Sequence, residues 1–520
     1  MEIAELFPYF QNPHFYPHSV ASEIQLIQTH CSAVFLTGEY AYKLKKPVDF
    51  GFLDYSTLEK RYYYLTQELV LNQAIAPEIY LSVLPISQCG ERLVLGSEEN
   101  IVEYTLQMAQ FPQDCLLVNL YEAGALTAEH IQELGLKVAQ FHQSAKVNDY
   151  ITDFGRIDVI KQSTDENYQT TEKYVGITQD LAQYQATRDF TNRFMVEKRA
   201  IFEQRQQQQK IRECHGDLHL KNICYWRNQI HLFDRIEFNE PFRYVDVMYD
   251  IAFAVMDLEA KKRQDLANLF LNTYLEQTGD WEGVQLLPFY LSRQAYVRAK
   301  VTSMLLDDPQ ISATDKQQAI ATAKDYYHLA WHYTQPQIGR IYVMSGLSGS
   351  GKTTVGRYLA QQCQGLQIRS DAIRKQLAGL TLHQTGDASL YYPEMTERTY
   401  HRLAELGLLL ASQGFTVILD AKYDRFCWRN PLLLAAQQQQ IPIQIIHCQA
   451  SISTLGDRLV NRQGDISDAT QSLLPQQQEQ WKDFTAEESP YVITLDTENE
   501  QWQTRLQEYL IGGDRQDGNP

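Results

Sequence analysis

The 520-residue sequence has no apolar run close to the roughly 18 residues needed to cross a bilayer, so it predicts no transmembrane helix. The beginning, MEIAELFPYF, lacks the basic segment and apolar stretch of a secretory signal. The eight cysteines are scattered and form no C-x-x-C pair, which argues against a zinc site or a disulfide framework. Cysteine usage of this kind is typical of a reducing compartment, and we expect a cytoplasmic protein.

Basic side chains are also in short supply. The 46 Lys and Arg residues face 64 Asp and Glu residues, which gives a formal charge of −18. This balance argues against broad binding to nucleic acid, although a local basic groove stays compatible with it. The composition, 44% hydrophobic and 21% charged, is that of an ordinary globular protein. Because a single core rarely grows beyond roughly 250–300 residues, the length predicts at least two domains.

The first part of the chain reads as an α+β domain. Residues 31–47 predict two short strands joined at Thr37-Gly38, and residues 57–75 predict a long helix. Further strand-like segments, ERLVLGS and NIVEYTLQM, follow before a mostly helical region that begins near residue 127. The pair NICYW and QIHLF interrupts this region as a short hairpin. A small strand-rich lobe followed by a large helical lobe is therefore expected.

The pattern changes after Gln335-Pro336. Five apolar runs, IYVMS, LQIRS, FTVIL, IPIQIIH and YVITLD, alternate with helical segments. This alternation is typical of a five-stranded parallel sheet wrapped by helices. We therefore predict a first domain over residues 1–333, a second domain over residues 339–511 and a disordered tail over residues 512–520.

A phosphate-binding loop lies between the first of these strands and the next helix. The stretch GLSGSGKT matches the pattern G-x-x-x-x-G-K-[ST] in full. Its glycines let backbone N–H groups close around phosphate oxygens at the positive end of a helix. We assign nucleotide binding to Gly346, Leu347, Ser348, Gly349, Ser350, Gly351, Lys352, Thr353 and Thr354. The lysine is expected to reach the β- and γ-phosphates, and the Thr353 hydroxyl to hold Mg²⁺.

Several charged residues follow later strands of the same domain. Asp371 comes after the second strand, where it either accepts a proton from a substrate hydroxyl or caps the next helix, and Arg374 lies one helical turn further on. Asp420 ends the strand FTVILD and is a candidate to orient Mg²⁺. Arg458 and Arg462 are four residues apart on one helix face, where they either close over transferring phosphates or form a solvated stripe.

These motifs give the C-terminal part a family resemblance. GLSGSGKTT, SDAIR, ILDAKYDR and DRLVNR together resemble the small P-loop kinases related to polynucleotide kinase, gluconate kinase and zeta-toxin-like kinases. The resemblance implies that Asp371 is the candidate base and that Arg458 and Arg462 belong to a lid. The SDAT segment at residues 467–470 resembles a recurrent feature of one uncharacterised subgroup.

The first domain carries a second candidate motif, HGDLHLKN. It resembles the catalytic loop of aminoglycoside phosphotransferases, choline kinases and other protein-kinase-like small-molecule kinases. The resemblance implies that Asp217 holds the attacking hydroxyl and that Asn222 binds Mg²⁺. Asp234, twelve residues past Asn222, would be the second metal ligand. His215 reads as a structural core histidine.

The segment RYVDVMYDIAF resembles the helix that braces such a loop. Asp250 is the expected brace, and Asp246 is an alternative that shares this role. The order of the two resemblances, a phosphotransferase-like domain and then a P-loop kinase, looks like a bacterial fused family, and it covers nearly the whole chain.

The resemblance also requires a lysine on a strand of the small lobe, paired with a glutamate on a helix. AYKLKKPV offers Lys43 and Lys45, which point to the same strand face, and we favour Lys43. Glu68 is the favoured partner and Glu59 the alternative. The glycine-rich cover of protein kinases is absent, which leaves the nucleotide grip open. IVEYTLQM looks like the strand that joins the lobes.

These observations predict a bifunctional ATP- and Mg²⁺-dependent phosphotransferase that acts on hydroxyl groups of small molecules. Two alternatives stay open: the C-terminal half phosphorylates a 5′-hydroxyl of nucleic acid, or the protein is an ATP-binding regulator that modifies no free metabolite. The acceptors themselves are not encoded in any motif, because acceptor pockets lie in variable helical regions.

Overall fold

The computed structural model describes residues 3–20, 23–309, 311–462 and 464–513, and the side chains as far as residue 510. The chain divides into two compact units. The first comprises residues 1–261 and 289–331, and the second comprises residues 262–288 and 332–520. The second unit thus contains a segment that is separated from the rest of the unit by residues 289–331 of the first. Of the predicted tail 512–520, residues 514–520 lie outside the described residues, and Gly513 ends the last helix.

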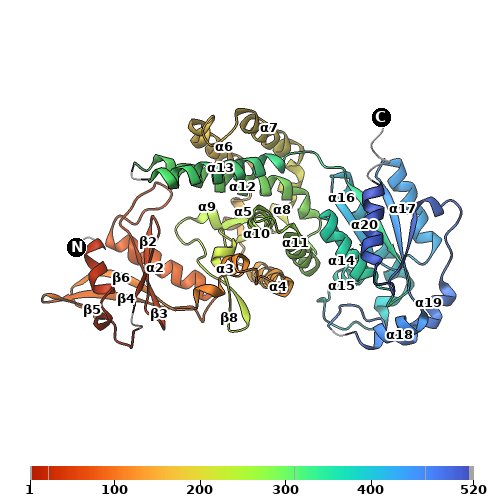
Figure 1. Cartoon of the computed structure of the whole chain (residues 1–520), viewed down its shortest axis with the longest axis horizontal. Helices are drawn as coiled ribbons and strands as arrows, with labels where there is room; N and C mark the ends of the chain where they lie inside the picture. Colours follow the sequence, from red (N-terminus) through yellow and green to blue (C-terminus); the bar gives the residue numbers. More distant parts are fainter. Residues whose placement is uncertain (1–2, 21–22, 310, 463, 514–520) are drawn as a thin grey trace. The chain divides into compact units, whose positions relative to one another are not determined.

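The small lobe of the first unit is built on a sheet of six antiparallel strands, in the order β1-β2-β3-β6-β4-β5. Its strands and helices are α1 (Ile3–Phe10), β1 (Gln25–Gln28), β2 (Ser32–Leu36), β3 (Tyr40–Lys45), α2 (Leu58–Gln73), β4 (Tyr80–Cys89), β5 (Arg92–Leu95) and β6 (Ile101–Ala109). Thr57 begins α2 by accepting the N–H of Lys60. Leu65 of α2 is fully buried with Ile79 and Leu106, so this helix is held on the β4–β6 part of the sheet (Figure 1).

The rest of the first unit is mainly helical. Its elements are α3 (Leu117–Glu122), α4 (Ala128–Ser144), α5 (Asp149–Asp153), α6 (Ile157–Thr171), α7 (Leu181–Glu197), α8 (Arg199–Gln207), β7 (Ile211–Glu213), β8 (Ile223–Trp226), β9 (Gln229–Leu232), α9 (Glu240–Arg243), β10 (Tyr244–Asp246), α10 (Val247–Ala260), α12 (Leu287–Met304) and α13 (Ala313–His332). The pairs β8-β9 and β7-β10 are antiparallel. The expected α+β unit with a strand-rich lobe and a helical lobe is confirmed.

The second unit is a parallel α/β structure. Its elements are α11 (Gln264–Thr278), β11 (Arg340–Ser345), α14 (Lys352–Cys363), β12 (Leu366–Arg369), α15 (Ser370–Leu377), α16 (Pro393–Ser412), β13 (Thr416–Asp420), α17 (Phe426–Gln438), β14 (Ile443–Gln449), α18 (Ile452–Val460), α19 (Leu474–Gln480), β15 (Val492–Asp496) and α20 (Trp502–Gly513). All four strand pairings in the order β12-β13-β11-β14-β15 are parallel, which confirms the predicted five-stranded sheet.

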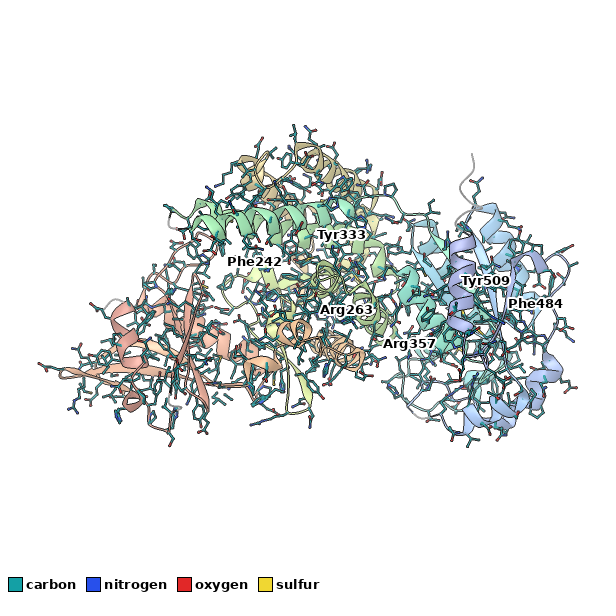
Figure 2. All side chains as sticks on the ribbon, viewed as in Figure 1. Phe242, Arg263, Tyr333, Arg357, Phe484 and Tyr509 are labelled. Atoms are coloured by element: carbon teal, nitrogen blue, oxygen red, sulfur yellow. The ribbon has the colours of Figure 1, made fainter. Side chains whose placement is uncertain are left out.

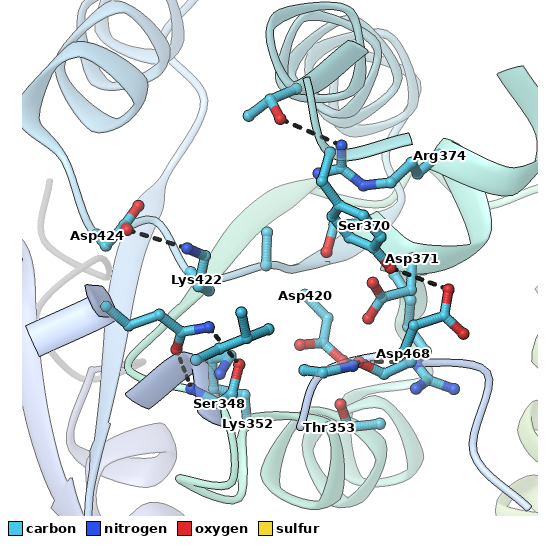
Figure 3. A pocket seen from close by; sticks show the side chains of 18 of the residues that line it. Ser348, Lys352, Thr353, Ser370, Asp371, Arg374, Asp420, Lys422, Asp424 and Asp468 are labelled. Carbon is cyan, nitrogen blue, oxygen red and sulfur yellow. Dashed lines mark hydrogen bonds and ion pairs between the residues drawn. The ribbon is translucent and has the colours of Figure 1, made fainter. Parts of the chain in front are cut away.

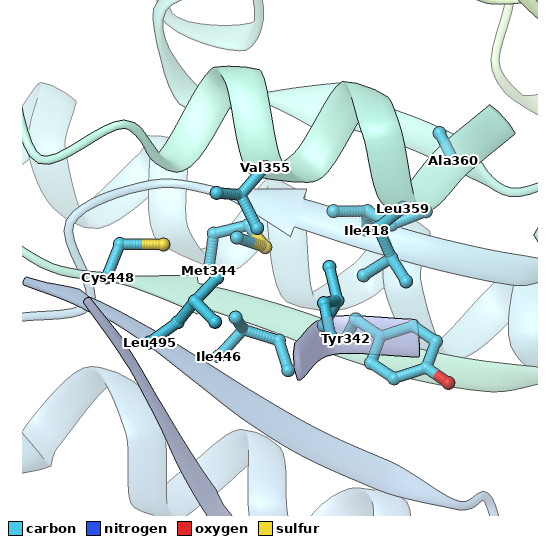
Figure 4. Packing of buried hydrophobic residues seen from close by; sticks show 10 residues of the cluster. Tyr342, Met344, Val355, Leu359, Ala360, Ile418, Ile446, Cys448 and Leu495 are labelled. Carbon is cyan, nitrogen blue, oxygen red and sulfur yellow. The ribbon is translucent and has the colours of Figure 1, made fainter. Parts of the chain in front are cut away.

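Apolar side chains cover both faces of this sheet. Figure 4 shows Met344 and Ile446 on the sheet beneath Val355 and Leu359 of α14. Leu419 points to the opposite face, where it lies against Gly407 of α16. Each fully buried leucine or isoleucine contributes about 1.5–3 kcal/mol of transfer free energy. This packing fixes the carboxyl ends of the strands, and the loops that carry the polar site residues leave from those ends.

Candidate active sites

The phosphate-binding loop of the second unit connects β11 to α14, as the sequence predicted. Gly346 has a φ of 141°, and a Cβ built there would lie 2.4 Å from the carbonyl oxygen of Cys448, so only glycine fits without displacing the backbone. Ser350 is buried, and Leu347 packs against the cluster of Leu455, Leu459 and Leu474. The loop is therefore held on its outer side by apolar contacts.

A cavity of about 1070 Å³ opens beside this loop. Figure 3 shows Lys352 and Thr353 on one side of it and Asp371 and Asp420 on another. The cavity brings together nearly all of the predicted C-terminal site residues, namely Ser348, Gly349, Gly351, Lys352, Thr353, Thr354, Asp371, Arg374, Asp420, Arg458 and Arg462. Segments more than a hundred residues apart in the sequence thus share one hollow.

Two charged groups of this cavity, Lys352 and Asp371, have shifted pKa values. Burial lowers the pKa of the Lys352 ammonium, whose Nζ donates to the carbonyl oxygen of Leu347 at 2.7 Å. Burial raises the pKa of Asp371, and the guanidinium of Arg369 opposes that rise. A carboxyl group with a raised pKa is a better proton acceptor than an ordinary aspartate, provided that it is ionised.

Three predicted arginines occupy different environments. Arg374 donates from Nη1 to the carbonyl oxygen of Leu390 at 2.6 Å and to Thr396 at 3.2 Å. Arg458 donates to the carbonyl oxygen of Gly349 at 3.3 Å and to the hydroxyl of Thr497 at 2.9 Å, so it holds the phosphate-binding loop itself. Arg462 lines the cavity, and its Nη1 has no hydrogen-bond partner among the described residues.

The sequence reasoning missed several residues of this cavity. Gln477 of α19 accepts the backbone N–H of Ser348 at 3.0 Å, and Tyr391 donates to Asp468 at 3.0 Å. Arg369 and Lys422 also line the cavity. Arg369 ends β12 directly before the SDAIR motif, and this position at a strand end is the signal that could have identified it.

In the first unit, the catalytic-type loop follows β7 and is braced from α10. Asp250 accepts the backbone N–H of Gly216 at 2.7 Å and that of His215 at 3.2 Å. Gly216 has a φ of 85°, and a Cβ there would lie 2.6 Å from the carbonyl oxygen of Phe242. Asp246 makes a different contact, a buried ion pair with Arg205 at 2.5 Å. The brace is thus Asp250, while Asp246 fixes the start of α10.

Asp217 and Asn222 lie together in this loop. Asn222 donates from Nδ2 to a carboxylate oxygen of Asp217 at 3.0 Å, an orientation that keeps its side-chain oxygen for a cation. His219, to which the sequence gave no role, lies 3.3 Å from the Asp217 carboxylate. Burial opposes ionisation of Asp217, but the neighbouring His219 and His215 outweigh it and lower the pKa to about 2. His215 is fully buried and contacts the carbonyl oxygen of Phe233.

Both candidate lysines of β3 reach the same glutamate. Lys43 Nζ lies 2.6 Å from Glu68 and 2.7 Å from Asp234, which follows β9 with a φ of 59°. Burial would lower the pKa of Lys43, but these two carboxylates raise it well above its usual value. Lys45 Nζ lies 2.7 Å from the other oxygen of Glu68 and also pairs with Glu237.

The two lysines differ in what surrounds them. The side chain of Lys45 is 2% exposed, and that of its partner Glu237 is 5% exposed, whereas Asp234 beside Lys43 is 44% exposed. Within this group of ion pairs, Lys43 therefore lies beside an exposed carboxylate, whereas Lys45 and its partners are buried. Glu59, the alternative partner, is exposed in the first turn of α2. Glu237 was not predicted, although it lies only three residues past Asp234.

Comparisons with known proteins find a family model for part of the second unit and relatives over most of the chain. Residues 341–484 match the family model described as AAA domain. Uncharacterized proteins of Mycobacterium tuberculosis and Mycobacterium bovis are 28% identical over 463 residues, which cover 87% of this chain and 89% of theirs.

Three solved structures are similar to one part of the chain each. A gluconokinase from Sinorhizobium meliloti covers 34% of this chain and 99% of its own, with 23% identity and a TM-score of 0.24. A choline/ethanolamine kinase family protein from Mesorhizobium loti covers 63% and 98%, with 8% identity and a TM-score of 0.36. A putative aminoglycoside phosphotransferase from Ralstonia eutropha covers 64% and 98%, with 12% identity and a TM-score of 0.37.

Fold and sites define a chain of two units: an α+β unit with an antiparallel six-stranded sheet, and a parallel α/β unit that carries a phosphate-binding loop and matches the AAA-domain model over residues 341–484. Among the described residues, no helix combines the length and the apolar character that crossing a bilayer requires.

Proposed function

We propose that the chain carries two phosphotransfer sites, each of which moves the γ-phosphoryl group of ATP to a hydroxyl group of a small molecule. One observation carries the proposal: a single cavity of the second unit joins a complete phosphate-binding loop to Asp371, Asp420 and several cationic side chains. A nucleotide needs the loop and the cations, and an acceptor hydroxyl needs a carboxylate beside the transferred group.

In the C-terminal site, Lys352 would neutralise the β- and γ-phosphates, and Asp371 would take the proton of the acceptor hydroxyl. Arg462, with a buried nitrogen that has no described partner, is available to stabilise charge on the transferring group. Arg458 would keep the phosphate-binding loop in place through its contacts with Gly349 and Thr497. Arg374 would shape the acceptor side, because its guanidinium bonds to Leu390 and Thr396.

In the N-terminal site, Asp217 would hold the acceptor hydroxyl and accept its proton. Its low pKa keeps it ionised at neutral pH, and Asn222 and His219 fix its carboxylate. Lys43 would contact ATP phosphates, because it is oriented by Glu68 and stands beside the exposed Asp234. The pairing of this lysine with a helix glutamate and a loop aspartate is the arrangement that phosphoryl transfer in protein kinases requires.

The residues present suit Mg²⁺ at both sites. Thr353 and Asp420 line one cavity and offer a hydroxyl and a carboxylate, while Asn222 and Asp234 offer an amide oxygen and a carboxylate. Oxygen ligands of this kind are those that Mg²⁺ prefers in nucleotide sites. When bound, the ion neutralises crowded phosphate oxygens.

A screen of hydroxyl-bearing metabolites tests the proposal. The full chain is incubated with Mg²⁺ and ATP, ADP release is recorded for each compound, and mass spectrometry identifies the phosphorylated product. We expect at least one acceptor to raise ADP release well above the rate without acceptor. The blank is the chain with both Asp217→Asn and Lys352→Ala. ATP binding with no acceptor-dependent release across the library would favour a regulatory role instead.

The two lysines of β3 are expected to respond differently to the same substitution. Lys43→Met should lower N-terminal turnover at least about tenfold, because the phosphates lose a charge contact. Lys45→Met leaves Glu68 and Glu237 facing each other in the interior, and loss of a buried partner typically costs about 3–5 kcal/mol of the free energy of unfolding. Urea unfolding and turnover are measured for both variants in a chain that also carries Lys352→Ala. Equal losses of turnover with equal stability would reject the distinction.

A further inference from the structure

The second unit contains one helix from far upstream, α11. Its side chains contact the backbone at the start of β12. Asn272 accepts the backbone N–H of Gln367 at 2.7 Å and donates to the carbonyl oxygen of Gly365 at 3.0 Å. Asn268 donates to the same oxygen at 2.9 Å. Gly365 directly precedes β12 and Gln367 lies in it; β12 is the edge strand of the sheet, so α11 satisfies backbone atoms that no further strand covers.

The strand that α11 holds carries two residues of the site. Gln367 donates from its side chain to Asp420 at 3.0 Å and to the carbonyl oxygen of Thr353 at 3.1 Å. Arg369 ends the strand and lines the cavity with 7% of its surface exposed. The position of β12 therefore bears directly on the candidate metal ligands and on the cationic lining of the cavity.

Near its C-terminal end, α11 presents Glu276 to this arginine. Glu276 lies 3.5 Å from Nη1 of Arg369, while Asp465 lies 2.6 Å from Nη2 and Asp420 lies 3.9 Å from Nε. A guanidinium is planar with donors on fixed edges, so three carboxylates around it determine its orientation. The carbonyl oxygen of Glu276 also accepts the side chain of Gln376, which ties the same turn of α11 to α15.

The charge of Glu276 balances a crowded group of ions. Burial raises the pKa of Glu276, and Arg369 together with Arg357 of α14, labelled in Figure 2, opposes that rise. Arg369 in turn stabilises the charged form of Asp371. Without the negative charge of Glu276, the Nη1 edge of Arg369 would be free to turn toward the cavity carboxylates.

We infer that Glu276 is a positioning residue of the C-terminal phosphotransfer site, acting through Arg369 although it stands outside residues 339–511. The inference rests on the proposed function of that site. Glu276 holds the Nη1 edge of the guanidinium, so that among the described ion pairs Arg369 meets Asp420 only through Nε and the two cavity carboxylates stay available, Asp371 to the acceptor and Asp420 to the cation.

Glu276→Gln tests this in the full chain with Asp217→Asn, so that turnover reports the C-terminal site. The substitution keeps the size of the side chain and removes its charge. At pH 8 we expect hydrolysis of Mg²⁺-ATP, without added acceptor, to fall about tenfold. Affinity for a fluorescent ADP analogue should change less than about twofold, because the phosphate-binding loop is untouched.

Glu282→Gln is the matched control, since Glu282 pairs with Arg402 of α16 and neither residue lines the cavity. It should leave turnover unchanged. If both variants lose turnover in proportion to a lower Tm, the role of Glu276 is structural and the inference fails. It also fails if Glu276→Gln turns over ATP as fast as its parent.

A second measurement keeps the two proposals apart. If Lys352→Ala does not change ATP turnover of the Asp217→Asn chain, the proposed function fails, and Glu276 is then judged by hydrogen exchange of the full chain. Glu276→Gln should speed deuterium uptake in residues 365–377, which form β12 and α15, and Glu282→Gln should not. Equal uptake in that segment for both variants would overturn the positioning role.

Discussion

Lys352→Ala is expected to lower the C-terminal activity of the full chain at least about a hundredfold. The buried ammonium is the cation placed by the phosphate-binding loop, and a transition-state charge contact of this kind is typically worth on the order of 3 kcal/mol. The measurement is acceptor-dependent ADP release with the acceptor that the metabolite screen identifies. N-terminal turnover should stay at its original rate, because Lys43, not Lys352, is the lysine proposed to contact the nucleotide in the first unit.

Lys482→Ala is the control for this substitution. Lys482 is an exposed lysine of the same unit and does not line the cavity, so its loss changes net charge equally without touching the site. Its turnover should equal that of the unaltered chain. Full activity of Lys352→Ala with every acceptor would mean that the P-loop unit binds nucleotide for a purpose other than phosphoryl transfer.

Asp217→Asn is expected to lower the N-terminal activity by roughly a hundredfold or more, the usual range for loss of a general base. The amide keeps the size of the side chain but no longer accepts a proton from the acceptor hydroxyl. Acceptor-dependent ADP release is measured beside urea unfolding, so that a loss of activity is separated from a loss of structure. The C-terminal activity should be unaffected.

Asp158→Asn supplies the same chemical change at an exposed position of the first unit, where the carboxylate pairs only with the neighbouring Arg156 among the ion pairs of the described residues. It should retain full turnover. If Asp217→Asn silences both activities while ATP still binds to the second unit, the two sites do not work independently. A coupled mechanism would then replace the proposal of two separate enzymes.

Local motifs could be recognised from the sequence because their chemistry is built from consecutive residues. The phosphate-binding loop joins one strand to the next helix, so its glycines, lysine and threonines appear as one continuous pattern. The loop with Asp217 and Asn222 is equally local, and the contact between these residues spans only five positions. The central strands β11, β13 and β14 were visible because they are largely buried on both faces and therefore mostly apolar.

The partners of charged residues that lie far apart in the sequence could not be predicted in this way. Lys43 and Lys45 share one strand face and one partner, Glu68, so a period of two residues cannot separate them. Only the folded chain places Asp234 beside one lysine and Glu237 beside the other. The expectation that Arg458 and Arg462 share one helix face was wrong, because α18 ends at Val460 and Arg462 lies beyond it. Thr497 and Gly349 fix Arg458, while Arg462 lines the cavity from the loop after the helix.

The sequence by itself determined the two candidate site motifs and the order of the two folds, because glycine geometry, strand burial and loop spacing are local properties. Tertiary structure alone decided that residues 262–288 belong to the second unit. The amides of Asn268 and Asn272 bind backbone atoms of Gly365 and Gln367, at the start of β12, that are 93 to 97 positions away. No sequence periodicity predicts such a contact, because nothing around an asparagine in a helix indicates which distant strand its amide will bind.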